Sequence, residues 1–396
     1  MHIVCCATLR RVVGELGRKM RVALVVPGGV DRSGEYRIIP ALVALLARLS
    51  RQHDVQVIAL SQEAQPGAWQ LAGAHIHNIG LRRTRTRALR TVLTLHGASH
   101  LDVIHAIWSG SCGLVAVAAA RLLRIPSLVH VAGGELVALP EIAYGGMLTW
   151  RGRVRERWTL RTASAVSAAS APVVAAIAAL GVTAQRVPLG VDLAQWPPRE
   201  PVRRDPGSPA KLVHVASLNR VKDQPTLLRA LAALAQAGVD FTIDIVGEDT
   251  LNGEVQALTR SLGLSARVRF RGFLPQRQLR PLVEAAHLMI VSSRHETGPL
   301  VALEAAVAGV PTVGTAVGHI AEWAPQAAMA VPIGDFAALA SAIAALLASE
   351  ELRLRIAREG FHRAVLEDAD HTAQRFQAIY ARLATAGSRP RSSPQY

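Results

Sequence analysis

The sequence predicts an α/β protein built from two doubly wound domains in tandem. Short apolar runs alternate along the chain with Ala- and Leu-rich stretches of helical length, a pattern typical of parallel sheets with helices on both faces. A stretch rich in Pro, Gly and charge interrupts this alternation near the middle of the chain. With 396 residues, 50% of them hydrophobic, the chain can bury two substantial cores.

The first domain is expected to span residues 20–195. RVALVVPGG is an apolar strand closed by Gly28 and Gly29, PALVALLARLSRQ has the pattern of a helix, and DVQVIAL is the next strand. The same alternation recurs in LDVIHAIW, VAVAAARLLR and IPSLVHVAGG, and again in ASAVSAAS, a helix over residues 172–180 and QRVPLG. These segments predict consecutive βαβ units.

WPPREPVRRDPGSP, residues 196–209, opposes both helix and strand and is predicted to link the domains. A second alternation, from AKLVHVASL to VPTVGTA, places the second domain at residues 210–370. An amphipathic stretch at 371–386 is expected to form a helix that crosses back to the first domain, and 387–396 to be a disordered tail. A second Met directly precedes the first strand, so residues 1–19 read as an extension outside the fold. Two such domains predict a ligand crevice between the carboxyl ends of their sheets.

The net charge of +15 comes almost entirely from Arg, since Lys occurs only at Lys19, Lys211 and Lys222. Such a field attracts anions, but the chain lacks aromatic interleaving and any nucleic-acid module, so we expect no nucleic-acid partner. Acidic small molecules and lipid headgroups remain open. The Arg-rich run LRRTRTRALR, residues 81–90, fits either a solvated helix face or peripheral contact with an anionic membrane.

Cys5, Cys6 and Cys112 form no even framework and no metal-ligand spacing, which favours a reducing compartment. No apolar stretch reaches the length of about 18 residues that a membrane span needs, and the apolar part of the N-terminus is too short for a signal peptide. The expected location is cytoplasmic, with contact at the inner face of the membrane left open. Asp368 and Asp370 form a D-x-D in a helical region that we interpret as surface charge, so no metal site is predicted.

The most informative segment is VSSRHETGPLVALEAAVAGVPTVGT, residues 291–315. Glu296 lies in the loop after a strand, and Glu304 is expected about two turns beyond the start of the following helix. Both carboxylates can face one elongated ligand. The intervening backbone offers amides at a helix N-terminus, a favourable place for an anion such as diphosphate; it comprises Thr297, Gly298, Pro299 and Leu300.

The E-x7-E spacing of Glu296 and Glu304, followed by LEAAVAGVPTVGT, resembles the signature of the retaining glycosyltransferases of family 4. That family has the GT-B fold, two Rossmann-like domains facing each other across a cleft, the first binding the acceptor and the second the nucleotide-sugar donor. VASLNRVKDQPTLLRAL resembles its phosphate-binding strand and loop, FTIDIVGED its next strand, RVRFRGFLPQRQL its base-binding region and VPLGVDL its domain junction. DVIHAIWSGSCGL and IPSLVHVAGGEL resemble first-domain motifs. The likeness spans roughly residues 21–383 and is more specific in the second domain.

The resemblance implies two catalytic residues and one ribose contact. Glu296 would accept hydrogen bonds from hydroxyls of the donor sugar. The alternative is that the carboxylate only caps the following helix. Lys222 would contact the donor diphosphate rather than the solvent, as a compact point charge suits that role. Glu304 would accept hydrogen bonds from the ribose; a buried Glu needs such a partner or a basic neighbour.

Further donor contacts are implied less directly. The family usually carries Arg five residues before the position of Lys222, where this chain has Ser217, and Arg220 is the candidate to supply the guanidinium instead. Gly28 and Gly29 match the glycine turn whose amides approach the donor phosphates or the acceptor.

The acceptor side departs from the family pattern. Ala132 stands where the family commonly has a His that contacts the reacting centre. Glu135 remains as an acceptor contact or a polar orienter, and His295 as a second acceptor contact or an ordinary loop histidine.

The implied reaction transfers a hexose from a nucleotide-diphosphate sugar to a glycan, glycolipid or other hydroxyl acceptor, as in cell-surface polysaccharide or glycoconjugate biosynthesis. It needs no metal and no other cofactor, because Lys222 and the helix N-terminus would stabilise the leaving phosphate. Two alternatives stay open: a nucleotide-sugar 2-epimerase, and a catalytically silent GT-B scaffold subunit of a polysaccharide assembly complex. The second is motivated by Ala132 and Ser217.

Overall fold

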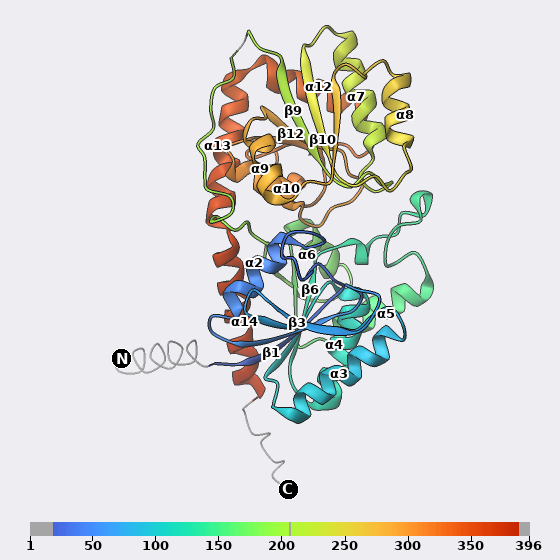
Figure 1. Cartoon of the computed structure of the whole chain (residues 1–396), viewed down its shortest axis with the longest axis vertical. Coiled ribbons are helices and arrows are strands. Elements are labelled where there is room, and N and C mark those ends of the chain that lie inside the picture. Colours follow the sequence, from blue (N-terminus) through green and yellow to red (C-terminus); the bar gives the residue numbers. More distant parts are fainter. Residues whose placement is uncertain (1–18, 206, 388–396) are drawn as a thin grey trace, which may run out of the picture.

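The computed structural model describes residues 19–205 and 207–387, which form two α/β domains one above the other (Figure 1). The extension predicted at the N-terminus and the tail predicted at the C-terminus therefore lie almost wholly outside the described residues. Each domain has its own sheet, and the prediction of two doubly wound domains is confirmed.

The sheet of the first domain has the order β3-β4-β2-β1-β5-β6-β7-β8. All neighbours pair in parallel except β3 and β4, which form an antiparallel edge hairpin. The interior of β1 is fully buried because helices cover both faces, which explains its continuous apolar run. The strands are β1 (Arg21–Val26), β2 (Asp54–Ala59), β3 (Gly67–Leu71), β4 (Ala74–Asn78), β5 (Val103–Ile107), β6 (Ser127–Val131), β7 (Ala165–Ala168) and β8 (Gln185–Arg186).

Two layers of helices enclose this sheet. One face is covered by α2 (Pro40–Leu49) together with the C-terminal helix. The other face shares a core with α3 (Thr84–Ala98), α4 (Leu114–Leu123), α5 (Trp150–Thr162) and α6 (Ala171–Ala178). Three short turns of helix, η1 (Ser109–Gly113), η2 (Gly134–Leu136) and η3 (Pro140–Ile142), lie in the loops after β5 and β6.

The sheet of the second domain is entirely parallel, with the order β11-β10-β9-β12-β13-β14. Its strands are β9 (Ala210–Val215), β10 (Phe241–Val246), β11 (Val268–Gly272), β12 (Leu288–Val291), β13 (Thr312–Thr315) and β14 (Met329–Val331). Its helices are α7 (Gln224–Gln236), α8 (Glu254–Ser261), α9 (Gln276–Glu284), α10 (Leu300–Val307), α11 (Gly318–Trp323), α12 (Phe336–Ala348) and α13 (Glu350–Leu366). Separate apolar clusters fill the two faces of the sheet, so the doubly wound pattern is complete.

The chain crosses between the domains earlier than the Pro-rich stretch suggested. Leu189 packs in the core of the first domain, whereas Val191 and Trp196 already pack in that of the second. The described part of 196–209 has no helix or strand, and its Arg199 N–H bonds to the carbonyl of Val307 in the second domain. The Pro-, Gly- and charge-rich composition of this stretch therefore indicates an irregular segment that packs along the second domain. It does not indicate the point at which the chain crosses between the domains.

A final helix, α14 (Ala369–Gly387), returns to the first domain, where the sequence placed a crossing helix. Its Phe376 and Tyr380 are buried with the core of the first domain, and Tyr380 Oη lies 2.7 Å from His105 Nδ1. In Figure 1, α13 and α14 form a nearly continuous column along both domains. This column ties the second domain to the back of the first.

Helix α10 begins later than expected, which corrects the placement of Glu304. Residues 296–299 remain a loop, and Pro299 has an extended backbone with φ −65° and ψ 110°. A proline disfavours helical geometry at the residue before it, here Gly298, and the extended ψ of Pro299 itself places the start of the helix at Leu300. Glu304 therefore lies about one turn, not two, from the start of the helix.

Candidate active site

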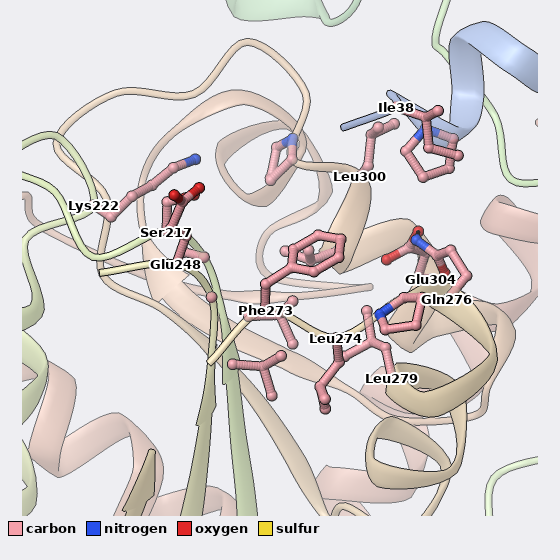
Figure 2. A pocket seen from close by; sticks show the side chains of 18 of the residues that line it. Ile38, Ser217, Lys222, Glu248, Phe273, Leu274, Gln276, Leu279, Leu300 and Glu304 are labelled. Atoms are coloured by element: carbon pink, nitrogen blue, oxygen red, sulfur yellow. Dashed lines mark hydrogen bonds between the residues drawn. The ribbon is translucent and has the colours of Figure 1, made fainter. Parts of the chain in front are cut away.

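A cavity of about 400 Å³ opens between the two domains at the carboxyl ends of β9, β10 and β12 (Figure 2). The first domain contributes residues from the loop before α2, among them Glu35 and Ile38, together with Ala132. The second contributes most of the wall. Of the site residues predicted from the sequence, the cavity is lined by Ser217, Lys222, Glu296, Thr297, Gly298, Pro299, Leu300 and Glu304.

Lys222 and Glu296 form an ion pair at one end of the cavity, with Lys222 Nζ 2.5 Å from Glu296 Oε1. The hydroxyl of Ser293 donates to the same carboxylate oxygen at 2.7 Å. The Ser292 hydroxyl donates to the Lys222 carbonyl at 2.8 Å and so fixes the lysine loop to the end of β12. Both charged side chains are partly exposed to the cavity, at 26% for Lys222 and 15% for Glu296. The pair places one cation and one anion where a polar ligand can reach both.

Glu304 lies at the other end of the cavity, opposite Lys222 (Figure 2). Its side chain is buried on the cavity-facing side of α10, and burial raises the pKa of its carboxyl to about 7. Gln276 Nε2 donates to Glu304 Oε1 at 3.0 Å. The indole N–H of Trp196 donates to Gln276 Oε1 at 2.7 Å. This chain of hydrogen bonds holds the carboxylate in one orientation.

The loop before α10 packs tightly between the two charged ends. A Cβ atom on Gly298 would lie 2.7 Å from His319 Nε2, so only glycine fits there. The sequence analysis treated the whole segment as a source of amides, but Pro299 has no N–H to donate. The donors at this helix start are the amides of Thr297, Gly298 and Leu300.

The structure does not bring Arg220 to the cavity. Its guanidinium bonds to the exposed carboxylate of Glu254 at 3.0 and 3.1 Å and lines a separate surface groove. Arg220 and Lys222 come from one turn, and only Lys222 points into the cleft. The idea that Arg220 replaces the guanidinium missing at Ser217 is therefore wrong for this conformation.

Gly28 and Gly29 form the expected turn after β1 but do not line the cavity. Gly29 has φ +79°, and the Ile39 side chain would collide with any Cβ placed on it. A Cβ on Gly28 would lie 3.2 Å from Gln62 Oε1. These glycines shape the loop that carries Glu35, and their contact with the donor phosphates or the acceptor stays a prediction.

Glu135 is a buried residue of the first domain, and its carboxylate accepts hydrogen bonds from Ser109 N at 2.8 Å and Gly133 N at 2.7 Å. Burial raises the pKa of this carboxyl to about 7. Glu135 does not line the cavity. Of the two roles the sequence left open, this geometry matches that of a polar orienter.

His295 bridges the domains rather than lining the cavity. Its Nε2 lies 3.5 Å from the carbonyl oxygen of Gly133, and its ring centroid lies 6.2 Å from that of Tyr144. Burial lowers the pKa of the imidazole below its ordinary value. A neutral His295 at this junction can position the Glu296 loop against the first domain.

Several cavity residues were missed by sequence reasoning. Glu35, Ile38, Glu248, Phe273 and Gln276 all line the cavity. The ring of Tyr36, beside Glu35, lies 5.9 Å from that of Phe273, so two aromatic residues meet across the cleft. Phe273 and Gln276 lie within the segment that resembles a base-binding region, and Glu248 lies within the segment FTIDIVGED, but nothing in those patterns singled out the individual residues.

Within residues 19–205 and 207–387, no cluster of three or more His, Cys, Asp or Glu side chains is placed to hold a metal ion. Asp370 pairs with Arg48 at 2.8 Å, and Asp368 Oδ1 accepts the backbone N–H of His371. Cys112 is buried, which raises the pKa of its thiol. No helix in the described part of the chain combines the length and hydrophobicity needed to cross a bilayer.

Both domains match known sequence families. Residues 37–190 match the family described as glycosyl transferase 4-like domain, and residues 199–363 match glycosyl transferases group 1. The chain is 29% identical to the 2-deoxystreptamine glucosyltransferase of Streptomyces kanamyceticus over 79% of this chain and 80% of that protein. It is 32% identical to the glycogen synthase of Mycobacterium tuberculosis over 43% of this chain and 42% of that protein.

Solved structures share the fold. Sucrose-phosphate synthase from Thermosynechococcus elongatus has a TM-score of 0.77 at 18% identity, over 93% of this chain and all of that one. Anabaena HepE in complex with UDP and glucose has a TM-score of 0.70 at 19% identity, over 90% of this chain and 98% of that one.

Two doubly wound domains facing each other over this cavity define the GT-B fold. The chain is a glycosyltransferase. Its first domain matches the glycosyl transferase 4-like family, and its second domain matches the glycosyl transferases group 1 family.

Proposed function

We propose that this glycosyltransferase moves a hexose from a nucleotide-diphosphate sugar to a hydroxyl of a glycan, glycolipid or similar acceptor, with retention of anomeric configuration. The observation that carries the proposal is the distribution of charge in the cavity. The Lys222–Glu296 pair stands at one end and the buried Glu304 at the other. An elongated donor with diphosphate and sugar at one end and ribose at the other matches this pattern, and about 400 Å³ is within the usual size of a small-molecule site.

In this proposal the donor displaces the internal ion pair. The diphosphate takes over Lys222 Nζ, and the freed Glu296 carboxylate accepts hydrogen bonds from sugar hydroxyls. The carboxylate of Glu304 accepts from the ribose, held in place by Gln276. The base lies against the loop of Phe273 and Leu274, which forms the adjoining wall.

The reaction breaks the bond between the anomeric carbon and the phosphate oxygen and forms a bond from that carbon to the acceptor oxygen. The acceptor proton passes to the departing phosphate on the same face of the sugar. Negative charge grows on the phosphate, where Lys222 and the amides at the start of α10 stabilise it. These groups take the role that a metal ion has in other transferases. We therefore expect turnover to survive a strong chelator. Loss of turnover with the chelator, and its rescue by a divalent ion, would refute the metal-independent mechanism.

The comparisons support a nucleotide-sugar donor. The relative from Streptomyces kanamyceticus is named a glucosyltransferase, and HepE was solved with UDP and with UDP-glucose. A role in cell-surface polysaccharide or glycoconjugate assembly remains part of the proposal.

A catalytically silent scaffold is the second candidate, favoured by Ala132 and Ser217, both of which line the cavity without a charge. Against it, Glu296 and Lys222 keep their charges directed at the cavity. A nucleotide-sugar 2-epimerase would use the same donor but convert it without any acceptor.

A thermal-shift screen against UDP, GDP and ADP sugars tests donor binding, because a ligand selective for the native state raises the melting temperature. Product analysis then separates the candidates. Transfer or slow donor hydrolysis with retained configuration supports the proposal. Epimerised donor supports the epimerase, and tight binding to a partner protein with no turnover supports the scaffold.

A further inference from the structure

Helix α5 of the first domain exposes an apolar stripe. Trp150, Val154 and Trp158 recur every four residues and so lie on one side of the helix. Their exposed fractions are 64%, 58% and 40%, although large apolar side chains usually pack inside. The opposite side of the helix is buried through Gly152, Thr159 and Leu160.

The exposed side of α5 carries only positive charge. Arg151, Arg153, Arg157 and Arg161 are all exposed beside the stripe. The single acid of the helix, Glu156, is fully buried and accepts hydrogen bonds from Ser109 Oγ at 2.7 Å and Arg155 Nε at 2.9 Å. Nothing acidic on the helix therefore offsets the arginines at its outer surface.

A second basic helix lies on the same side of the molecule. Helix α3 covers the same face of the sheet as α5, and both appear on the lower right of Figure 1. Both also reach the turn η1, α3 through the Arg85 Nε bond to Ser111 at 3.2 Å and α5 through Glu156 and Ser109. The Arg-rich run adds the exposed side chains of Leu81, Arg82, Arg83, Arg85, Arg87 and Arg90, and α3 contains no acid. We call the exposed side chains of this run and of α5 the α3–α5 face.

We propose that the α3–α5 face binds the surface of an anionic lipid membrane. Trp favours the boundary between headgroups and acyl chains, and Arg can reach the phosphates while its stem stays in apolar surroundings. An amphipathic helix with Trp on one side and Arg on its flanks lies in that interface. A second copy of the chain is a poor occupant, because it would bring two arginine-rich faces together. A face that served only for solvation would not need the two tryptophans.

Flotation of the full-length protein with lipid vesicles tests this proposal. The protein should float with phosphatidylcholine vesicles that contain about 30% phosphatidylglycerol, should not float with pure phosphatidylcholine, and should detach as salt is raised. Arg151→Glu/Arg157→Glu should lower the partition coefficient about tenfold or more, since each Arg near an anionic surface contributes to the free energy of membrane binding. Trp150→Ser/Trp158→Ser should weaken binding at unchanged net charge.

The matched control is Arg355→Glu/Arg358→Glu, which reverses two exposed arginines on α13 of the second domain and should leave binding unchanged. A thermal melt equal to that of the wild type shows that each variant is folded. The proposal fails if the wild type ignores anionic vesicles, which would direct attention to an acidic protein partner. It also fails if the control pair loses as much binding as the α5 pair, because net charge alone would then explain the result. The measurement reads lipid binding only, so its outcome is independent of sugar transfer.

Discussion

Gln276 donates a 3.0 Å hydrogen bond to Glu304, a buried carboxylate on the cavity-facing side of α10. Burial raises the pKa of this carboxyl from 4.5 to about 7, against the opposing effect of the Gln276 bond. The residue proposed to hold the ribose therefore titrates near neutral pH.

The first prediction follows from this titration. With a raised pKa, folded Glu304 binds its proton more tightly than the unfolded chain, so its contribution to stability is full below about pH 4.5 and is lost as the pH rises through about 7. Glu304→Gln should remove this loss, which amounts to at most about 3 kcal/mol. Melting temperatures between about pH 5 and pH 8 should fall less in the variant than in the wild type.

Glu135 has a similarly raised pKa, but it is present in both proteins and cancels in the difference. Glu359→Gln, at an exposed position on α13, is the matched control and should follow the wild type. Parallel pH curves for the wild type and Glu304→Gln would show that Glu304 titrates in its ordinary range.

The second prediction concerns Lys222→Ala. A charge-assisted contact is worth roughly 1.5–3 kcal/mol, so the nucleoside diphosphate should lose about ten- to a hundredfold in affinity. The nucleoside alone should bind nearly as before, because Glu304 and the Phe273 loop are untouched. Calorimetry on both ligands makes this comparison, with Lys211→Ala, an exposed lysine on β9, as the control. Equal losses for the two ligands would indicate structural damage, and no loss would remove Lys222 from the donor site.

The third prediction is that Glu296→Gln keeps the fold and most of the nucleotide affinity but lowers turnover about ten- to a hundredfold. A neutral amide stabilises the positively charged sugar of the transition state less well than a carboxylate does. Steady-state kinetics should show the loss in kcat rather than in donor KM. Turnover within error of the wild type would end the assignment of Glu296.

The fourth prediction separates two neighbours in one turn. Arg220→Ala should change nucleoside diphosphate affinity by no more than about twofold, since its partner Glu254 is exposed and such surface pairs contribute little. A loss comparable with that of Lys222→Ala would mean that Arg220 swings into the cleft when the donor binds.

The fold was predictable wherever strands are buried on both faces and read as short apolar runs, as in β1, β9 and β12. The hairpin of β3 and β4 escaped notice because its strands are short and half exposed. Its turn consists of Ala72 and Gly73, both with positive φ, and Ala gives no hint of that conformation.

The candidate site was predictable where its residues follow one another in the chain. Glu296, Glu304 and the loop between them reached one cavity, although their roles stay predictions. Gln276 and Trp196 are 80 residues apart in sequence, and the residues around them form no sequence pattern that predicts a hydrogen bond between them. For Arg220 the prediction relied on closeness in sequence to Lys222. The two residues share one turn, but their side chains point in different directions.

The close contact between Gly190 and Asp368 limits how the two domains can move. The chain crosses to the second domain beside Gly190 and returns beside Asp368, where Gly190 N bonds to Thr372 Oγ1 and Ala369 N to the carbonyl of Val191. A Cβ on Gly190 would lie 2.2 Å from the Asp368 carbonyl carbon, so only glycine lets the two crossings touch. Two connections in contact have the geometry of a single hinge line between the domains. We therefore expect relative motion of the domains to be a rotation about that line, because a separation of the domains would break the hydrogen bonds of both crossings.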